Sequence, residues 1–301
     1  RIEKDFEDFS RELPGKAEEI EKRMETLNAD IVIGMKYLYS NMPYSDVGNY
    51  TFDTYPDYVQ QGIWLWENSP YVKKYPELYF LNYVLFHRTN DEEIKPCRTY
   101  FWEKIKDRIQ GMSMMEAVLE INHWCAGEVM YQGTDMRTGS ALEIYRSGVG
   151  RCGEEAVFVV NVLRSAGIPA RPVYVPRWSH CDDNHAWVEV WCDGDWHYLG
   201  ACEPEAVLDK GWFTNAASRA MMIGSRWYDR AMPDEDVIGK DGMNRIINLL
   251  GKYAKTKRIT IRVEDLEGTP AGGARVQAEV MNYGEFSPVA KISADENGCI
   301  S

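Results

Sequence analysis

The chain has 301 residues, and its 45% hydrophobic content is ordinary for globular proteins, so it can form two domains and part of a third. Its formal net charge of -13 argues against a nucleic-acid partner, because binding to phosphate groups requires a basic surface. The sequence contains no run of about 18 apolar residues, so we predict no membrane-spanning helix.

The seven cysteines argue against a structural zinc site. Their number is odd, so at least one thiol is free or bonded outside the chain. No two of them have the CxxC spacing that is typical of structural zinc sites. We therefore predict no metal site, and no residue pattern indicates a cofactor.

Residues 1–112 are predicted to form a helical region. Apolar residues recur at helical spacing from Ile2 to Leu13 and again from Ala17 to Leu27, and Asn28 is placed to cap a third helix. The region contains no set of side chains that chemistry would need. We expect it to be a scaffold that packs on the rest of the protein.

Two capping boxes predict the next helices. Residues 113–116 (Ser-Met-Met-Glu) begin a helix whose apolar face includes Cys125, which we interpret as a small core residue. Residues 140–143 (Ser-Ala-Leu-Glu) begin a shorter helix that Gly148 is expected to end.

Cys152 follows in the segment GVGRCGEEA, residues 148–156. Three glycines around one cysteine indicate tight turns and a backbone that a ligand can approach. Apolar residues then predict a largely buried helix that stops at Gly167. Cys152 would lie in the first turn of that helix, where unpaired backbone N–H groups lower a thiol pKa. We interpret Cys152 as a nucleophile; a structural cysteine is the alternative.

Strands are predicted after this helix. Residues 168–176 read as an extended strand, and NHAWVEVW (residues 184–191) shows the alternation of a second one. His185 opens that second strand. A lone histidine on a strand is usually structural, but together with Cys152 it suits a general base.

The turn after this strand predicts how its partner strand pairs with it. Asp193-Gly194 is a two-residue hairpin loop, which fixes the register of the two strands. The register places Trp191 opposite Trp196 and His185 opposite Cys202.

The end of the sequence changes character. Residues 233–257 are expected to form a linker, and residues 258–301 alternate like strands separated by turns. The last segment resembles carboxypeptidase regulatory-like or immunoglobulin-like modules. We expect it to be a partial β-sandwich that serves spacing or attachment, because it has too few strands for a complete one.

From Thr134 to Phe213 the sequence resembles the transglutaminase-like superfamily, whose core is papain-like. The resemblance rests on GRCGEEA at Cys152, GIPARPVY after the helix and NHAWVEVW at His185, in this order. It implies an α+β fold in which a helix packs on an antiparallel sheet. The expected domains are then a helical region (1–112), a transglutaminase-like core (113–232), a linker (233–257) and a partial β-sandwich (258–301).

The resemblance also implies roles for individual residues. Cys152 would be the nucleophile, His185 its general base and acid, and Gln132 would stabilise the oxyanion. We expect Trp178 and Trp187 to contact the substrate.

The resemblance fails at one catalytic position. The family usually has an aspartate on the strand after the histidine, where this chain has Gly200. Glu203 is the nearest carboxylate that could replace it; the other candidates are a backbone carbonyl, Asp183, Asn184, Glu205 and Asp209.

These residues imply a cysteine-dependent acyl-transfer enzyme that acts on peptide or amide bonds through a thioester at Cys152. We expect hydrolysis rather than crosslinking, with a peptide, protein or glycopeptide as substrate. Two alternatives stay open: a catalytically degenerate protein that binds peptide or glycan, which Gly200 supports, and a deglycosylating amidase. The family and the appended module imply a bacterial protein exported to a periplasm or to the cell surface.

Overall fold

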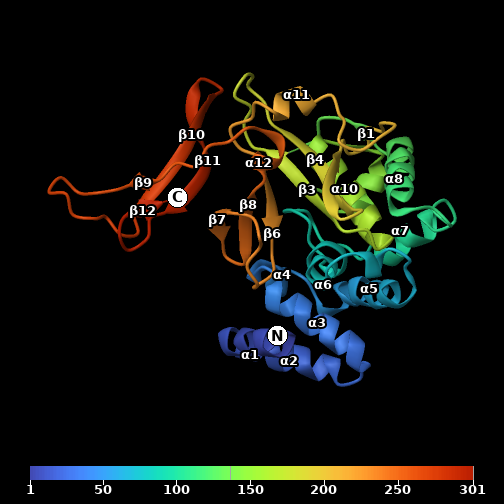
Figure 1. The fold of residues 1–301 in the computed structure, drawn as a ribbon. Helices are drawn as coiled ribbons and strands as arrows, with labels where there is room; N and C mark the ends of the chain where they lie inside the picture. The colour runs from blue at the N-terminus through green and yellow to red at the C-terminus, as the bar shows by residue number, and fades with distance from the viewer. Residues whose placement is uncertain (136, 301) are drawn as a thin grey trace.

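The computed structural model describes residues 1–135 and 137–300. Its N-terminal part is helical, as predicted, and lies at the bottom of Figure 1. Asn28 caps its helix as expected, because its side chain accepts a hydrogen bond from the N–H of Ile31 at 2.9 Å. The elements are α1 (Ile2–Glu12), α2 (Pro14–Met24), α3 (Ala29–Asn41), α4 (Tyr44–Asn49), η1 (Phe52–Thr54), α5 (Pro56–Asn68), η2 (Val72–Lys74), α6 (Glu77–Phe80), η3 (Leu81–Leu85) and α7 (Arg98–Ile105).

Three helices and a short strand pair surround the cysteine. Both predicted capping boxes are present, at the start of α8 (Met114–Glu128) and of α9 (Ala141–Ser147). Helix α10 (Cys152–Ser165) begins at the cysteine, and from its third residue onward its side chains are buried. The short strands β1 (Met130–Tyr131) and β2 (Val149–Gly150) pair in parallel immediately before α10.

A six-stranded sheet forms the other layer of the core. Its order is β5-β4-β3-β6-β8-β7, and each pair of neighbouring strands is antiparallel. Helix α10 packs on β3 and β4, so the helix-on-sheet arrangement is confirmed (Figure 1). The strands are β3 (Ala170–Val175), β4 (His185–Cys192), β5 (Asp195–Leu199), β6 (Gly224–Trp227), β7 (Val237–Asp241) and β8 (Asn244–Asn248), with α11 (Thr214–Ala217) between β5 and β6 and α12 (Leu250–Tyr253) after β8.

The segment 233–257 is not the linker that the sequence suggested. It contributes β7 and β8 to the core sheet, where β8 pairs with β6. A buried ion network also ties it to the centre of the sheet: Arg171 on β3 bonds Glu189 on β4 and Glu235, at 2.8 Å in each case. The acidic, turn-rich composition obscured two short strands that become stable only by joining a larger sheet.

The C-terminal segment forms two small sheets, which stand beside the core in red in Figure 1. The hairpin of β10 (Arg275–Asn282) and β11 (Glu285–Ser293) is the larger, and β9 (Ile261–Arg262) pairs with β12 (Cys299–Ile300) in the other. The hairpin tip touches the loop before β4: Asn282 donates to the carbonyl oxygens of Trp178 and Cys181 at 3.0 and 2.8 Å.

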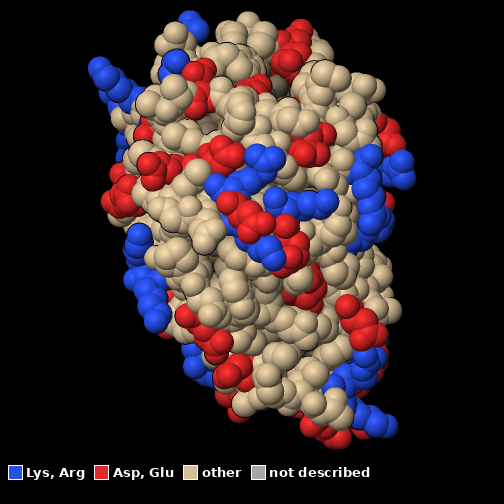
Figure 2. Space-filling view, turned by 90° about the vertical axis from the view of Figure 1, so that its right-hand side faces the viewer, with Lys and Arg blue, Asp and Glu red and all other residues tan. Residues whose placement is uncertain are grey.

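Two surface properties bear on partners. Within residues 1–135 and 137–300, no helix is long and apolar enough to cross a bilayer. On the face that Figure 2 shows, Lys and Arg side chains are interspersed with Asp and Glu rather than gathered in one patch. This face therefore presents no broad field of a single sign.

Candidate active site

Cys152 is the first residue of α10, and local contacts fix its position. The capping contact is made by Glu154, whose carboxylate accepts from the N–H of Arg151 at 3.0 Å and from the N–H of Gly139 at 3.2 Å. The N–H of Gln132 donates to the carbonyl of Gly150 at 2.9 Å and so continues the β1–β2 pairing. Gln132 is exposed, and its backbone pairs with Gly150, which is two residues before Cys152 in the chain.

The thiol of Cys152 does not have the low pKa that its helix position suggested. Burial raises its pKa, although the backbone N–H groups of Ala186 and Gly153 point at the sulfur and act in the opposite direction. The negative charges of Glu155 and Asp183 raise it further. The sequence-based expectation considered the helix terminus alone, whereas desolvation of the thiolate is the larger effect here.

His185 opens β4 as predicted, opposite Val175 of β3. Its side chain is packed among aromatic rings, with ring centres 4.6 Å from Trp212 and 5.1 Å from Phe213. Only 6% of His185 is exposed, and its Nε2 is buried without a hydrogen-bond partner among the described residues. Burial lowers the pKa of His185 to about 4, while the charge of Asp183 acts to raise it, so the ring is neutral at pH 7.

Two observations place Cys152 and His185 in one neighbourhood. The backbone of Ala186, the residue after His185 on β4, lies close enough to the Cys152 thiol to lower its pKa. The carboxylate of Asp183 acts on the titration of both the thiol and the imidazole. The start of α10 and the start of β4 therefore share a neighbour in Asp183, on two elements that pack together.

The chain leaves β4 earlier than the hairpin register suggested. Trp191 pairs with Trp196 as predicted, but the pairing of β4 with β5 ends at Leu199. The chain then turns, with a bridge between Gly200 and Glu203 and a positive φ of 56° at Cys202. Cys202 is therefore not opposite His185.

The turn places the carboxylate of Glu203 in the space beside Gly200. A Cβ atom built on Gly200 would lie 2.3 Å from Oε2 of Glu203 and 2.9 Å from its Cβ, so no larger side chain fits there without displacing Glu203. The indole N–H of Trp212 donates to both carboxylate oxygens, at 2.9 and 3.0 Å. Glu203 thus reaches His185 through Trp212, whose ring lies against the imidazole.

The other candidate carboxylates of this region are engaged elsewhere. Asp209 bonds His197 at 2.6 Å and the N–H of Tyr198, and Glu205 pairs with Lys210. Asp183 accepts from the N–H of Asn184 at 2.8 Å. Asp183 acts on the imidazole through its charge, and Glu203 is linked to it through Trp212.

Glu155 is a site residue that the sequence reasoning missed. It lies one helical turn after Cys152, is 4% exposed and has its pKa raised to about 8 by burial and by the charges of Glu203 and Glu154. A carboxyl with that pKa is mostly protonated at pH 7. Its position three residues after Cys152 was the signal that could have found it, since i and i+3 share a helix face.

The two tryptophans expected to contact substrate lie in the core instead. Trp187 has no exposed surface and donates to the hydroxyl of Tyr253 at 2.9 Å, and Trp178 is 3% exposed. Both belong to the aromatic cluster on the sheet face away from α10. The exposed tryptophan next to the imidazole is Trp212, with 65% of its surface open to solvent.

No metal site is formed among the described residues, where no three His, Cys, Asp or Glu side chains gather suitably. The seven cysteines all lie within the described ranges, and each is a free thiol.

Comparison with known proteins gives one family. Residues 103–201 match the sequence model of the transglutaminase-like superfamily. A "putative cysteine protease" from Cytophaga hutchinsonii shares 18% identity over 50% of this chain and 57% of its own, with a TM-score of 0.30. A "putative protease" from Parabacteroides distasonis shares 15% identity over 56% of this chain and 29% of its own, with a TM-score of 0.33.

This chain therefore corresponds to little more than half of one solved structure and under a third of the other. TM-scores this low carry no argument about activity. No curated protein matches the chain.

Proposed function

We propose that the chain, whose residues 103–201 match the transglutaminase-like superfamily, is a cysteine-dependent enzyme that hydrolyses peptide or amide bonds through a thioester at Cys152. The observation that carries the proposal is the Cys152 thiol at the start of α10, a helix that packs on β4, the strand that His185 opens. Covalent acyl transfer needs a nucleophile next to a neutral imidazole, and the proposal assigns these two roles to Cys152 and His185.

The first chemical step follows from the charge states. Because burial raises the thiol pKa and lowers that of the imidazole, the resting pair is neutral rather than an ion pair. His185 would take the proton from the thiol as sulfur attacks the acyl carbonyl. The N–H of Cys152, which has no partner within the helix, and the side chain of Gln132 would donate to the oxyanion that forms.

The next steps reverse the proton transfer. The imidazolium of His185 gives its proton to the leaving amine, and the C–N bond breaks to leave a thioester on Cys152. Water then attacks the thioester, with His185 as base, and releases the acid and the free thiol. Glu203 is a positioning residue in this scheme, because it holds Trp212 and Trp212 packs on the imidazole.

One observation favours a second candidate, a protein that binds peptide or glycan without turnover. His185 is nearly covered, and its Nε2 has no partner among the described residues. If Trp212 never moves away, the substrate cannot reach the imidazole. Turnover separates the two candidates.

The test uses fluorogenic peptide amides and a glycopeptide with the wild-type chain and with Cys152→Ala. We expect release of amine or of glycosylamine by the wild type and a loss of about 10³-fold or more in Cys152→Ala, because the covalent route is removed. Cys299→Ala, which removes a thiol of the C-terminal segment, is the matched control and should keep its rate.

The outcomes distinguish the candidates. Turnover that survives in Cys152→Ala would remove Cys152 from the mechanism. No turnover by the wild type, together with unmodified Cys152 after iodoacetamide treatment, would favour the binding protein. Formation of a peptide–methylamine adduct when methylamine is added would indicate transfer beside hydrolysis.

A further inference from the structure

A large cavity lies apart from the cysteine site. Its volume is about 1370 Å³, and no residue of α10, of β4 or of the turn after β5 lines it. It is bounded by α1, α4, the loop of residues 88–93 and the strands β6 to β8. The helical region expected to be only a scaffold thus forms part of a cavity with the core sheet.

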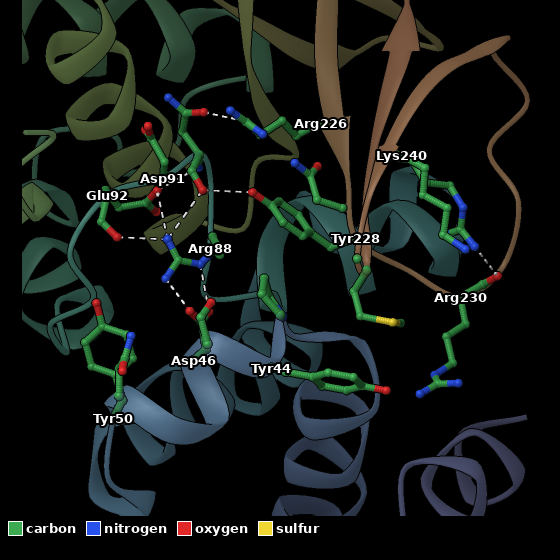
Figure 3. Close-up of a pocket in the computed structure, with 18 of the residues that line it drawn as sticks. Tyr44, Asp46, Tyr50, Arg88, Asp91, Glu92, Arg226, Tyr228, Arg230 and Lys240 are labelled. Carbon is green, nitrogen blue, oxygen red and sulfur yellow. Dashed lines mark hydrogen bonds and ion pairs between the residues drawn. The ribbon is translucent and has the colours of Figure 1, made fainter. Parts of the chain in front are cut away.

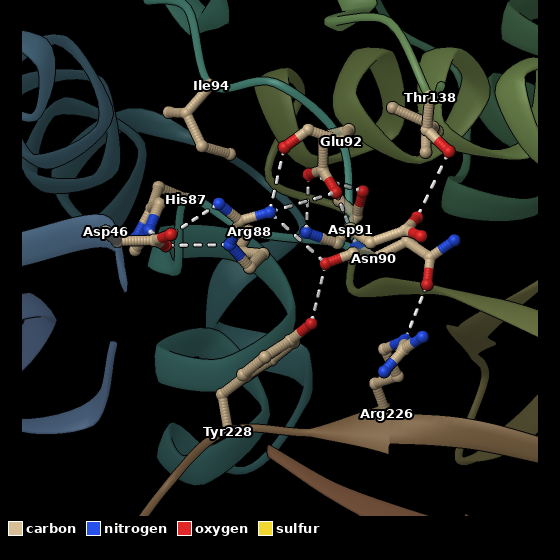
Figure 4. A network of polar contacts seen from close by, with 12 residues as sticks. Asp46, His87, Arg88, Asn90, Asp91, Glu92, Ile94, Thr138, Arg226 and Tyr228 are labelled. Carbon is tan, nitrogen blue, oxygen red and sulfur yellow. Dashed lines mark hydrogen bonds and ion pairs between the residues drawn. The ribbon is translucent and has the colours of Figure 1, made fainter. Parts of the chain in front are cut away.

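The floor of the cavity is a buried polar network (Figure 4). Arg88 donates to Asp46 through two nitrogens, at 2.7 and 2.5 Å, and to the carbonyl of Glu92 at 2.8 Å. His87 bonds the same carboxylate at 2.9 Å. All four side chains are at most 7% exposed, so the floor is held in one shape before any ligand arrives.

The wall formed by β6 to β8 is basic. Four cations from residues 226–245 line the cavity and no acidic residue from that segment does: Arg226, Arg230, Lys240 and Arg245. Arg226 uses Nε to bond Asn90, and among the described residues its two terminal nitrogens and the Lys240 amine have no hydrogen-bond partner. Figure 3 shows Arg226, Arg230 and Lys240 facing the side that carries Tyr44 and Asp46.

The rest of the lining is charged, polar and aromatic, and the acidic side chains come from the side opposite the basic wall, on α1, α4 and the loop of residues 88–93. Tyr44, 47% exposed, and the tyrosines Tyr50 and Tyr228 line the cavity, whereas Pro43 and Met243 are its only apolar non-aromatic side chains among the described residues. Most small-molecule sites are mainly apolar with few polar groups. A cavity of the opposite composition suits a ligand that both donates and accepts hydrogen bonds along its whole length.

One buried group supports the same ligand chemistry. Asn244 lines the cavity and is 8% exposed, yet its Oδ1 has no hydrogen-bond partner among the described residues. A buried amide left unpaired is costly, and a ligand hydroxyl would satisfy it.

We propose that this cavity binds an oligosaccharide that carries carboxylate groups. The hydroxyl groups match the polar lining, the apolar faces of sugar rings match the tyrosines, and a carboxylate matches the free fork of Arg226, since guanidinium groups bind carboxylates through two nitrogens. An acidic peptide has the same charge, but it has no sugar-ring face to lie against the tyrosines and few hydroxyl groups for the polar lining.

The experiment measures binding of trigalacturonate to full-length Cys152→Ala, so that turnover cannot interfere, by titration calorimetry. The comparison ligands are neutral maltotriose and triglutamate. We expect trigalacturonate to bind with a Kd of about 1 mM or tighter, and both comparison ligands to bind at least about tenfold more weakly. Added salt should weaken the binding, because a charge pair contributes to it.

Variants locate the binding in this cavity. Arg226→Gln and Tyr44→Ala should each weaken binding about tenfold. Lys240→Gln removes a second positive charge from the basic wall and should also weaken binding. Because Lys240 is exposed, this variant tests the role of the wall even if Arg226→Gln fails to fold. Arg108→Gln, an arginine outside the lining, should bind within about twofold of the parent protein.

Three results would overturn the proposal: no binding of trigalacturonate, equal binding of triglutamate, or unchanged affinity in Lys240→Gln and in a folded Arg226→Gln. The binding test uses a protein without the Cys152 thiol. Absence of trigalacturonate binding would therefore not contradict the proposed hydrolase, and absence of turnover would not contradict the proposed binding cavity.

Discussion

Glu155 gives the site a pH dependence of stability that can be derived from its burial. Its pKa rises from 4.5 to about 8, so between these values the folded protein holds a proton that the unfolded chain has lost. Stability therefore falls as the pH rises through this window. His185 acts with the opposite sign: its pKa falls from 6.5 to about 4, so stability rises with pH between these values.

The two effects oppose each other up to about pH 6.5, and only Glu155 acts above it. We therefore predict that the wild type loses up to about 2 kcal/mol of unfolding free energy between pH 6.5 and 8, and that Glu155→Gln abolishes this loss. Urea unfolding at the two pH values measures it. Glu67→Gln is the control, because Glu67 is exposed on α5 and its charge is not among those that raise the pKa of Glu155. An equal loss in Glu155→Gln would refute the assignment.

We propose that the turn after β5 supplies the carboxylate that the family's aspartate would provide. The absence of a side chain at Gly200 leaves room for the Glu203 carboxylate, which then holds Trp212 against His185. The acid is thus supplied from three residues further along the chain, into the same space. Gly200 is the reason why Glu203 fits, and not by itself a sign of a lost site.

This substitution predicts a specific pattern of variants. Glu203→Ala should lower kcat by about tenfold or more, since Trp212 loses its hydrogen bonds and His185 its packing partner. Adding Gly200→Asp to Glu203→Ala puts a carboxylate back into the vacated space and should recover part of the loss. Gly200→Asp alone should destabilise the protein, because Glu203 blocks it.

Steady-state kinetics, a pH–rate profile and thermal unfolding of the three variants measure these effects. A merely structural role for Glu203 would lower the melting temperature without moving the pH profile. No recovery in the double variant, with the fold intact, would show that a carboxylate in this space does not act on His185.

Elements with local signals were predictable from the sequence. Both capping boxes, the start of α10 at Cys152 and the Trp191–Trp196 pairing follow from side chains that are close in sequence. The order of cysteine, helix and histidine strand also placed the two site residues together.

Features that depend on distant segments were not predictable. The early end of β5, the strands β7 and β8 and the burial of Trp178 and Trp187 are decided by the surrounding sheet and core. The thiol pKa of Cys152 belongs to the same class, since desolvation by the whole fold outweighs the helix terminus. The cavity is lined by residues from 1 to 245 and has no local signature at all.

At the scale of the whole molecule, the C-terminal hairpin is hydrogen-bonded to the loop that precedes His185. Its tip residue Asn282 is 1% exposed and donates to the carbonyls of Trp178 and Cys181, and the N–H of Tyr283 donates to Asp182 at 2.6 Å. The same loop carries Asp183, whose charge acts on both Cys152 and His185. We infer that the C-terminal segment supports the site rather than only spacing it from another part of the protein.

Asn282→Ala removes two buried hydrogen bonds and should therefore loosen the loop 177–183 without unfolding the core. We predict faster amide hydrogen exchange in this loop and unchanged exchange in α10, measured by mass spectrometry on the intact chain. Glu279→Ala, an exposed change on the same strand, is the control and should alter neither segment. If the loop exchanges at the wild-type rate in Asn282→Ala, the hairpin does not hold it, because those two bonds are the main polar link between them.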